Sequence, residues 1–498
     1  FSWIKTYGSP ELDQALGELS PPPDFGCQLW AHQKAIFLLL VELKRFMIHV
    51  GLGGGKTLLT LMLLKYRKQC GEKPKAIVFV PYITSVDTWV EEVKKHAPDL
   101  RCIGLLGTTA ANLEQLRHDG DLFVICYQSA VAMVAEAVSD PHGKTKWQLS
   151  ANQVRKYFAG FDMLVCDEVH RAKSVSSLTF RMCRAISAQC EYVLGLTGTP
   201  FGKDLTDLWP QFYLIDFGET LGPTLGFYRA VFFDHKINYW GGLDYHFKKR
   251  MMPILTRIIK HKSIHYSVDE FSDMPPRQYI SRTLPPPPDS EGYCQVALKA
   301  IREAHKGKGS YQLIESNYLK LRQLSSGFLT LKGEDNAKLQ IKFQHNPKLE
   351  ALADLVDSLP AGSKCVIFHH FVFSNALISD RLKELKIGHA RIWGGAKDPI
   401  GQLRKFRTDP DCRVLVINVK SGSSSLNLQF ANYLIFFEQP DSPIDRQQAE
   451  ARVWRPGQAK RVMIYDLLVR DTVDHQLHAA NLAGADLLQE LLEGKVQL

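Results

Sequence analysis

The sequence predicts an α/β fold with two parallel-sheet lobes and a helical insertion at their junction. Its 498 residues contain short, continuous apolar runs that are rich in Val, Ile and Phe. Strands that are buried on both faces, as in parallel sheets, have this composition. Helical patterns lie between the runs, as βαβ units require. The runs form two clusters, before about residue 215 and after about residue 360, which indicates two lobes.

The apolar runs give the expected strands in order. The first lobe should contain strands over 76–80, 122–126, 163–166 and 192–196. The second lobe should contain strands over 365–368, 413–417, 433–437 and 462–467. Amphipathic patterns predict helices between these strands, over 57–68 and 377–385.

The segment between the two clusters has a different composition. Residues 227–264 are basic and aromatic without the alternation of a strand, and four prolines follow at 285–288. Such a proline run fits neither a helix interior nor a central strand. A helical pattern returns over 291–325. We therefore expect four parts: an N-terminal extension (1–24), a first lobe (25–215), a helical insertion with a linker (216–300) and a second lobe (301–498).

Composition and charge exclude several classes of protein. With 45% hydrophobic and 23% charged residues, the chain is neither disordered nor fibrous. Its longest apolar runs are far shorter than the roughly 18 residues of a membrane span, and we find no secretory leader. The ten cysteines include no Cys-x-x-Cys pair, which indicates reduced thiols. We expect an intracellular, cytoplasmic protein (in a host cell if it is viral), and the net charge of +9 suits a polyanionic partner.

A glycine-rich segment precedes the first amphipathic helix and contains three consecutive glycines, Gly53, Gly54 and Gly55. Glycines allow backbone N–H groups to approach a phosphate closely, and a helix N-terminus adds a favourable dipole. Lys56 would then reach the β- and γ-phosphates of ATP, and the Thr57 hydroxyl would bind Mg²⁺. The alternative interpretation is a plain glycine-rich turn before a helix.

Two carboxylates end the expected strand at 163–166. Asp167 would hold Mg²⁺, and Glu168 would orient and polarise the attacking water. Two solvated acids are the alternative, but a phosphate loop followed about a hundred residues later by such a strand is the layout of a P-loop ATPase. A third element, Leu196–Pro200, carries small hydroxyl residues that would link the nucleotide site to its neighbours; a simple turn is its alternative.

In this order, the motifs resemble those of helicase superfamily 2, and within it the SWI/SNF-type DNA-dependent ATPases. The resemblance extends over about residues 29–477. In the first lobe, Leu29–Gln33 is similar to the adenine-reading Q motif, Pro81–Trp89 to a nucleic-acid-facing motif and Asp167–His170 to the DExH box. Departures mark a divergent member, because Val50 and Gly51 replace the acidic pair that usually precedes the P-loop glycines.

In the second lobe, Cys365–His369, Ser421–Leu428 and Gln447–Gln458 are similar to motifs four, five and six of the same family. The element Arg-x-x-Arg-x-Gly-Gln, which starts at Arg452, favours the SWI/SNF group over the RNA helicases. Motif five departs from its usual glycine-rich form, since residues 423–425 are all serine.

The resemblance implies two RecA-like lobes that bind ATP and Mg²⁺ between them. Gln33 would read the adenine, and Gly422 and Asn427 would complete the nucleotide site. Arg452 and Arg455 would stabilise the charge that develops on the γ-phosphoryl group. Because these arginines are three residues apart, they would share one face of a helix; an isolated pair of this kind would otherwise be a solvated face.

Phosphate contacts from both lobes would hold the nucleic acid, and such contacts carry little sequence information. The candidate residues are Thr84, Ser85, Trp89, Gln128, His369, Arg391, Lys420 and Ser421. Each is alternatively an ordinary surface or core residue, and Trp89 in particular suits a core. The basic residues at 248–262 suit contact with a second strand as well as they suit a solvated helix.

These inferences predict an ATP-dependent translocase that moves along double-stranded or branched DNA as a monomer and remodels forks, joints or bound proteins. A strand-separating helicase acting on DNA or RNA is an alternative of the same class. An alternative from another class is a nucleotide-gated DNA-binding module without significant turnover. The presence of Lys56, Asp167, Glu168 and both arginines argues against that last alternative.

Overall fold

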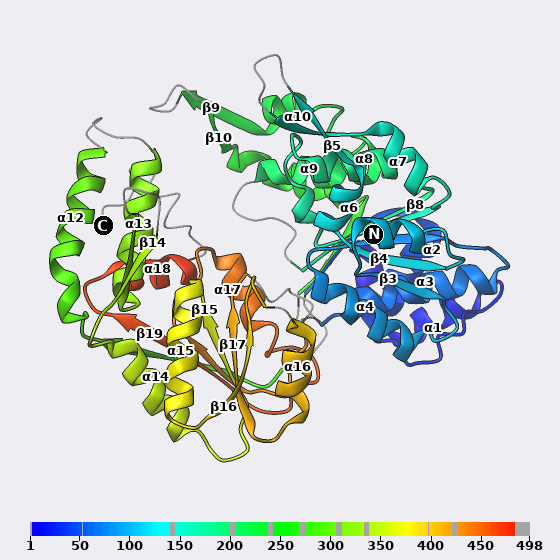
Figure 1. Ribbon diagram of the computed structural model, residues 1–498. Helices are drawn as coiled ribbons and strands as arrows, with labels where there is room; N and C mark the ends of the chain where they lie inside the picture. Colours follow the sequence, from blue (N-terminus) through cyan, green and yellow to red (C-terminus); the bar gives the residue numbers. More distant parts are fainter. Residues whose placement is uncertain are drawn as a thin grey trace. The chain divides into compact units, whose positions relative to one another are not determined.

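The computed structural model describes residues 2–51, 53–139, 145–198, 205–237, 243–267, 270, 274–304, 311–332, 338–396, 398–420 and 426–483. The chain divides into two compact units, Phe1–Asp273 and Met274–Leu498. Each unit contains its own large parallel sheet with helices around it, and Figure 1 shows the first from blue to green and the second from green to red. The predicted α/β class with two parallel-sheet lobes is confirmed.

The first unit has a seven-stranded sheet in the order β11-β1-β8-β7-β2-β4-β3, with every neighbouring pair parallel. Its strands are β1 (Arg45–Val50), β2 (Ala76–Val80), β3 (Cys102–Leu105), β4 (Leu122–Cys126), β7 (Met163–Asp167), β8 (Tyr192–Thr197) and β11 (Ser263–Tyr266). Because parallel strands point the same way, the segments that follow β1, β7 and β8 lie at one edge of the sheet.

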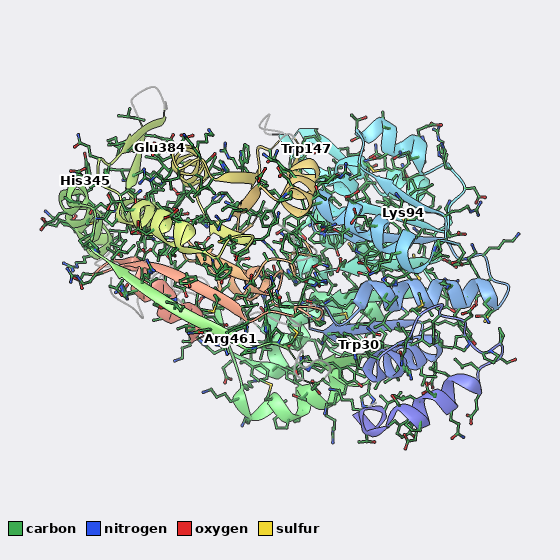
Figure 2. All side chains as sticks on the ribbon, turned by 90° about the horizontal axis from the view of Figure 1, so that it is seen from below. Trp30, Lys94, Trp147, His345, Glu384 and Arg461 are labelled. Carbon is green, nitrogen blue, oxygen red and sulfur yellow. The ribbon has the colours of Figure 1, made fainter. Side chains whose placement is uncertain are left out.

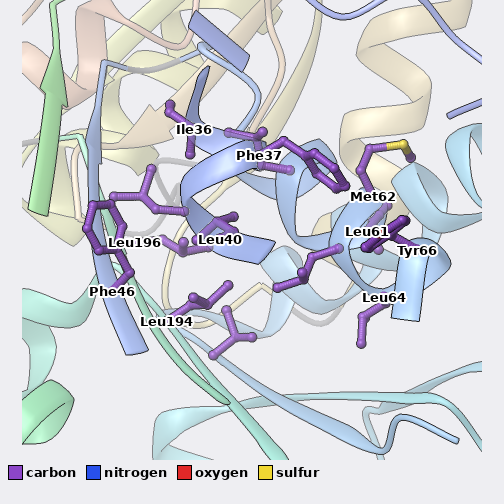
Figure 3. Packing of buried hydrophobic residues seen from close by; sticks show 14 of the residues in the cluster. Ile36, Phe37, Leu40, Phe46, Leu61, Met62, Leu64, Tyr66, Leu194 and Leu196 are labelled. Carbon is purple, nitrogen blue, oxygen red and sulfur yellow. The ribbon is translucent and has the colours of Figure 1, made fainter. Parts of the chain in front are cut away.

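Two hydrophobic cores, one on each face, hold helices against this sheet. The first core joins it to α1 (Ser9–Gly17), α2 (Ala31–Glu42), α3 (Lys56–Gln69) and α4 (Ile83–His96). Figure 3 shows part of it, where Ile36 and Leu40 of α2 lie on the side of strand residues such as Leu196, and Phe37 points toward α3. The second core joins the sheet to α6 (Tyr127–Val134), α7 (Ala151–Phe158), α8 (Leu178–Ser187), α9 (Leu208–Asp216), α10 (Leu225–Phe232) and α11 (Met252–Ile259). The short α5 (Thr109–Gln115) follows β3.

The second unit has a six-stranded parallel sheet in the order β12-β19-β18-β15-β17-β16. Its strands are β12 (Arg277–Leu284), β15 (Cys365–His369), β16 (Gly388–Ile392), β17 (Cys412–Asn418), β18 (Tyr433–Phe436) and β19 (Val462–Val469). Its helices are α12 (Glu291–Glu303), α13 (Tyr311–Ser325), α14 (Pro347–Ser358), α15 (Val372–Glu384), α16 (Pro399–Thr408), α17 (Pro443–Glu450) and α18 (Val473–Leu482). None of the helices in the described parts of the chain is long and apolar enough to cross a membrane.

A buried ion pair joins helices of the second unit. The Lys348 ammonium of α14, which is fully buried, lies 2.6 Å from the Asp474 carboxylate at the start of α18. The Ser325 hydroxyl of α13 and the Val469 N–H at the end of β19 also donate to this carboxylate, at 3.0 and 3.2 Å. Four elements therefore meet at one buried negative charge.

The expected insertion at 216–300 differs from the structure. Its first part forms α10 and α11 together with the antiparallel hairpin of β9 (Phe233–Ile237) and β10 (Leu243–Phe247), and β11 then joins the sheet of the first unit. Strand β12 joins the sheet of the second unit and ends at Leu284, directly before the four prolines. The segment is thus divided between the two units and is only partly helical.

Two further hairpins lie outside this segment. They are β5–β6 (Ala135–Ser139, Thr145–Leu149) and β13–β14 (Phe328–Lys332, Lys338–Lys342).

Candidate nucleotide site

A tight loop connects β1 to α3 and carries the glycine-rich sequence. Gly53 and Gly55 have φ angles of 83° and 86°, in the left-handed region that only glycine adopts without strain. Lys56 is the first residue of α3, and its ammonium group donates to the Val50 carbonyl oxygen at 2.8 Å. The lysine thus folds back across the loop, and its expected contact with phosphate groups stays a prediction.

Side chains of helix α2 hold this loop by polar contacts with the carbonyl oxygen of Gly54. The Gln33 side-chain amide donates to the Gly54 carbonyl oxygen at 3.3 Å, and the His32 Nε2 lies 2.9 Å from the same oxygen. The Gln33 Oε1 accepts from the Trp30 N–H at 3.0 Å. The side chain of Trp30 itself is exposed, and Figure 2 labels its position. Gln33 therefore braces the loop, and its expected contact with adenine stays a prediction.

The Asp167 carboxylate lies at the end of β7, close to the loop. The Trp89 indole N–H donates to its Oδ2 at 3.1 Å, and the Tyr127 hydroxyl donates to its main-chain carbonyl at 3.1 Å. Burial and the charge of Glu168 raise the pKa of Asp167 to about 6, although the Trp89 N–H and the Lys56 charge lower it. A buried acid with this raised pKa would gain from a cation.

Glu168 adopts a left-handed conformation, with φ 51° and ψ 58°. A residue with a side chain is strained there by about 1–2 kcal/mol, and such strain often marks functional sites. The carboxylate is 3% exposed and accepts from the Thr197 hydroxyl at 3.3 Å, while the His170 Nδ1 lies at 3.3 Å. Because β8 lies beside β7, Thr197 of the expected coupling element reaches Glu168; residues 199 and 200 of that element lie outside the described residues.

These residues fit a magnesium nucleotide. Oxygen donors are the ligands that Mg²⁺ prefers, and it commonly takes one or two from protein and the rest from phosphate and water. Asp167 and the partly buried Thr57 offer such oxygens. In the described ranges, no group of three or more His, Cys, Asp or Glu side chains could hold a metal ion.

In the second unit, the predicted helical face for Arg452 and Arg455 is wrong. Helix α17 ends at Glu450, whose carbonyl oxygen accepts from the N–H groups of Val453 and Trp454 in a turn. Pro456 and Gly457, with a φ of 95° at the glycine, follow directly and do not favour a continuing helix. The two arginines are therefore held by turns.

The two arginines differ in their surroundings. Arg452 is 2% exposed and donates to the Val419 carbonyl oxygen at 3.1 Å, and its guanidinium lies 5.5 Å from the Phe368 ring centroid. Arg455 is half-buried. The Leu428 N–H donates to the Arg452 carbonyl at 2.9 Å, which places Asn427 of motif five beside motif six. Gly422 and Ser421 lie outside the described residues.

Four of the eight expected nucleic-acid contacts are buried: Thr84, Ser85, Trp89 and His369. None of these side chains is available to a nucleic acid strand in this structure. The imidazole of His369 lies between the Phe371 carbonyl oxygen and the Asn375 amide, and burial lowers its pKa to about 4.

The remaining described candidates suit a surface role better. Gln128 and Lys420 are exposed, and Lys420 lies 2.8 Å from the Asp441 carboxylate. Arg391 is partly exposed, with its guanidinium 4.5 Å from the Trp393 ring centroid.

Sequence reasoning missed the hydrogen bond from Trp89 to Asp167, because it joins residues that are 78 positions apart.

Comparisons with known proteins identify two domain families in the chain. Residues 47–259 match the SNF2-related domain, and residues 347–457 match the helicase conserved C-terminal domain. A zebrafish SWI/SNF-related, matrix-associated, actin-dependent regulator of chromatin (subfamily A containing DEAD/H box 1A) is 21% identical over 85% of this chain and 47% of its own length. A RAD54-like DNA repair and recombination protein of Drosophila ananassae is 25% identical over 86% of this chain and 57% of its own length. The chain spans about half the length of these curated relatives.

Among solved structures, the Sulfolobus solfataricus SWI2/SNF2 ATPase core in complex with dsDNA is similar over 95% of this chain and 94% of that one, with 19% identity and a TM-score of 0.41. The two domain matches define the class of protein, which is a nucleic-acid-dependent ATPase. More narrowly, the chain belongs to the SWI/SNF-type ATPases of helicase superfamily 2.

Proposed function

We propose that this protein is an ATP-dependent DNA translocase that couples ATP hydrolysis to movement along duplex DNA and remodels forks, joints or bound proteins. One observation carries the hydrolytic part of the proposal: Lys56, Asp167 and Glu168 gather at one edge of the first sheet, with Thr197 hydrogen-bonded to Glu168. The names of the relatives, which include DNA repair and recombination proteins, support DNA as the substrate.

Each residue at this edge has a distinct task. Lys56 provides positive charge for the β- and γ-phosphates, and Glu168 orients and polarises the attacking water. When bound at Asp167 and Thr57, Mg²⁺ would neutralise phosphate charge. The hydroxyl of Thr197 fixes one oxygen of Glu168, so that the carboxylate keeps its orientation toward the water. We assign to Arg452 and Arg455 the task of stabilising the negative charge that develops on the γ-phosphoryl group.

Movement along DNA requires that the grip on the phosphate backbone changes during the ATP cycle. Gln128 in the first unit and Arg391 and Lys420 in the second are the described candidates with accessible side chains. The net charge of +9 favours association with a polyanion. Backbone contacts of this kind fit a motor that acts on DNA irrespective of its sequence.

Triplex displacement tests the proposal directly. A translocase moving on duplex DNA should remove a third strand in the presence of ATP and magnesium without separating the duplex. The Glu168→Gln variant should displace nothing while it still binds ATP. Separation of the duplex itself would instead identify a strand-separating helicase, and no displacement of either kind by an actively hydrolysing protein would contradict movement along DNA.

A further inference from the structure

A buried hydrogen bond connects helix α4 to the nucleotide site. Trp89 lies in the middle of α4 and is 1% exposed, and its indole N–H donates to Oδ2 of Asp167 at 3.1 Å. The acceptor is a carboxylate, and hydrogen bonds to charged groups are stronger than those between neutral groups. A phenylalanine would fill most of the same space but would leave this oxygen without its donor.

The bond restricts how the carboxylate can turn. The Tyr127 hydroxyl already holds the main chain of Asp167 through its carbonyl oxygen, at 3.1 Å. With the main chain held by Tyr127 and Oδ2 held by Trp89, the rotation of the carboxylate is restricted before any cation arrives. Residues that hold a metal ligand in this way commonly change metal affinity or activity when they are replaced.

A second contact joins the same two segments. Tyr82 directly precedes α4, and the guanidinium of Arg171, four residues after Asp167, lies 4.5 Å from its ring centroid. Between these two contacts, Ile83 at the start of α4 is exposed, whereas Thr84 and Ser85 are buried. Both ends of residues 82–89 therefore contact the segment 167–171 that carries the Asp167 carboxylate. Ile83, the first residue of α4, faces solvent.

We propose that Trp89 is a positioning residue that sets the Asp167 carboxylate for magnesium and makes α4 the mechanical link between bound DNA and the nucleotide site. The link to DNA rests on the proposed function, whereas the positioning of Asp167 does not. A shift of α4 on DNA binding would move the indole N–H and, with it, the carboxylate oxygen that it holds.

The Trp89→Phe variant tests the positioning role by nucleotide binding. Binding of a fluorescent ADP analogue is measured by anisotropy while Mg²⁺ is varied, and again in EDTA. The half-saturating Mg²⁺ concentration should rise by roughly ten- to hundredfold, and the affinity in EDTA should stay within about twofold of the wild-type value, as expected for a loss confined to the metal ligand. The affinity in EDTA separates this effect from a loss of stability, because a smaller folded fraction would weaken nucleotide binding both with and without Mg²⁺.

Trp209→Phe is the matched control in the same unit. Trp209 is also buried, and its indole N–H donates to the Gly222 carbonyl oxygen at 2.9 Å. The variant therefore loses a buried indole hydrogen bond, here to a neutral acceptor, without touching Asp167. Its Mg²⁺ requirement should equal that of the wild type. An unchanged requirement in Trp89→Phe, or an equal rise in both variants, would overturn the positioning role.

The link to DNA has a separate readout. At saturating Mg²⁺, the ratio of ATP turnover with and without duplex DNA should fall in Trp89→Phe and stay at the wild-type value in Trp209→Phe. A ratio that is unchanged in Trp89→Phe would overturn the link. If the wild-type protein shows no stimulation by duplex DNA, the proposed function fails, and the magnesium experiment still decides the role of Trp89 by itself.

Discussion

The side-chain amide of Gln33 donates to the carbonyl oxygen of Gly54, and this bond holds helix α2 against the loop that precedes Lys56. The fit at the next residue is tight, since a Cβ at Gly55 would collide with the amide nitrogen of Gln33. Gly55 also needs its left-handed conformation, with a φ of 86°. The loop can therefore keep its shape only with glycine at this position.

Gly55→Ala should abolish nucleotide binding because the added methyl group displaces Gln33 and distorts the loop. Gly71→Ala is the matched control: Gly71 has a φ of 84° in the same unit, but nothing lies within 4 Å of its Cβ position. Both variants should lose about 1–2 kcal/mol of stability from the left-handed backbone. Thermal unfolding and binding of a fluorescent nucleotide check both effects; equal nucleotide affinity in the two variants would contradict this account of the loop.

Glu168→Gln should bind ATP with near-normal affinity and hydrolyse it at least about a hundredfold more slowly, because an amide cannot polarise the attacking water as a carboxylate does. Single-turnover hydrolysis and equilibrium ATP binding measure the two quantities separately. Glu191→Gln, at an exposed carboxylate paired with Lys44 in the same unit, is the control and should hydrolyse ATP normally. Normal turnover in Glu168→Gln would remove Glu168 from the reaction.

Arg455→Ala should fold normally, bind ATP and lose turnover by roughly a thousandfold, as expected when an arginine that stabilises the transferred phosphoryl group is removed. Arg452→Ala should show the same loss together with about 1–3 kcal/mol of destabilisation, because it leaves the Val419 carbonyl oxygen without its donor in a buried site. ATPase rates and urea unfolding distinguish the two variants. Turnover near the wild-type rate in Arg455→Ala would show that it does not act on the phosphate.

Lys348→Ala should destabilise the second unit by about 3–5 kcal/mol, because it leaves the Asp474 carboxylate buried without its cation. Lys383→Ala is the control, since Lys383 forms an exposed ion pair with Asp380 in the same unit and should change stability little. Urea unfolding followed by circular dichroism measures both. Similar midpoints for the two variants would show that the buried pair contributes no more than a surface pair.

The strands predicted from sequence are those buried on both faces, for which local composition is sufficient. All eight expected runs form strands, whereas β1, β3, β11, β12 and β16 of the two large sheets were missed. For β1 and β12 the reason can be identified. In β1, the polar Arg45 interrupts the apolar pattern, yet its guanidinium is satisfied by distant carbonyl oxygens, such as that of Cys190 at 2.7 Å. In β12, which is mostly exposed, the strand exists because it pairs with β19, about 180 residues away.

The gathering of Lys56, Asp167 and Glu168 at one edge of the sheet was predictable from residue type and spacing, whereas their roles toward a nucleotide stay predictions. The site was not predictable where tertiary contacts decide the role. Trp89 was assigned to nucleic acid or core from its motif alone, and only the fold shows its hydrogen bond to Asp167. For Arg452, a local signal was present, because the Pro456-Gly457 pair indicates that the preceding helix ends early.

The most direct test of the central claim is the steady-state ATPase rate measured with no nucleic acid, single-stranded DNA, duplex DNA and RNA. The account predicts that duplex DNA stimulates the wild-type rate most and that Glu168→Gln stays inactive under all four conditions. Equal wild-type rates under the four conditions would contradict the coupling of hydrolysis to DNA.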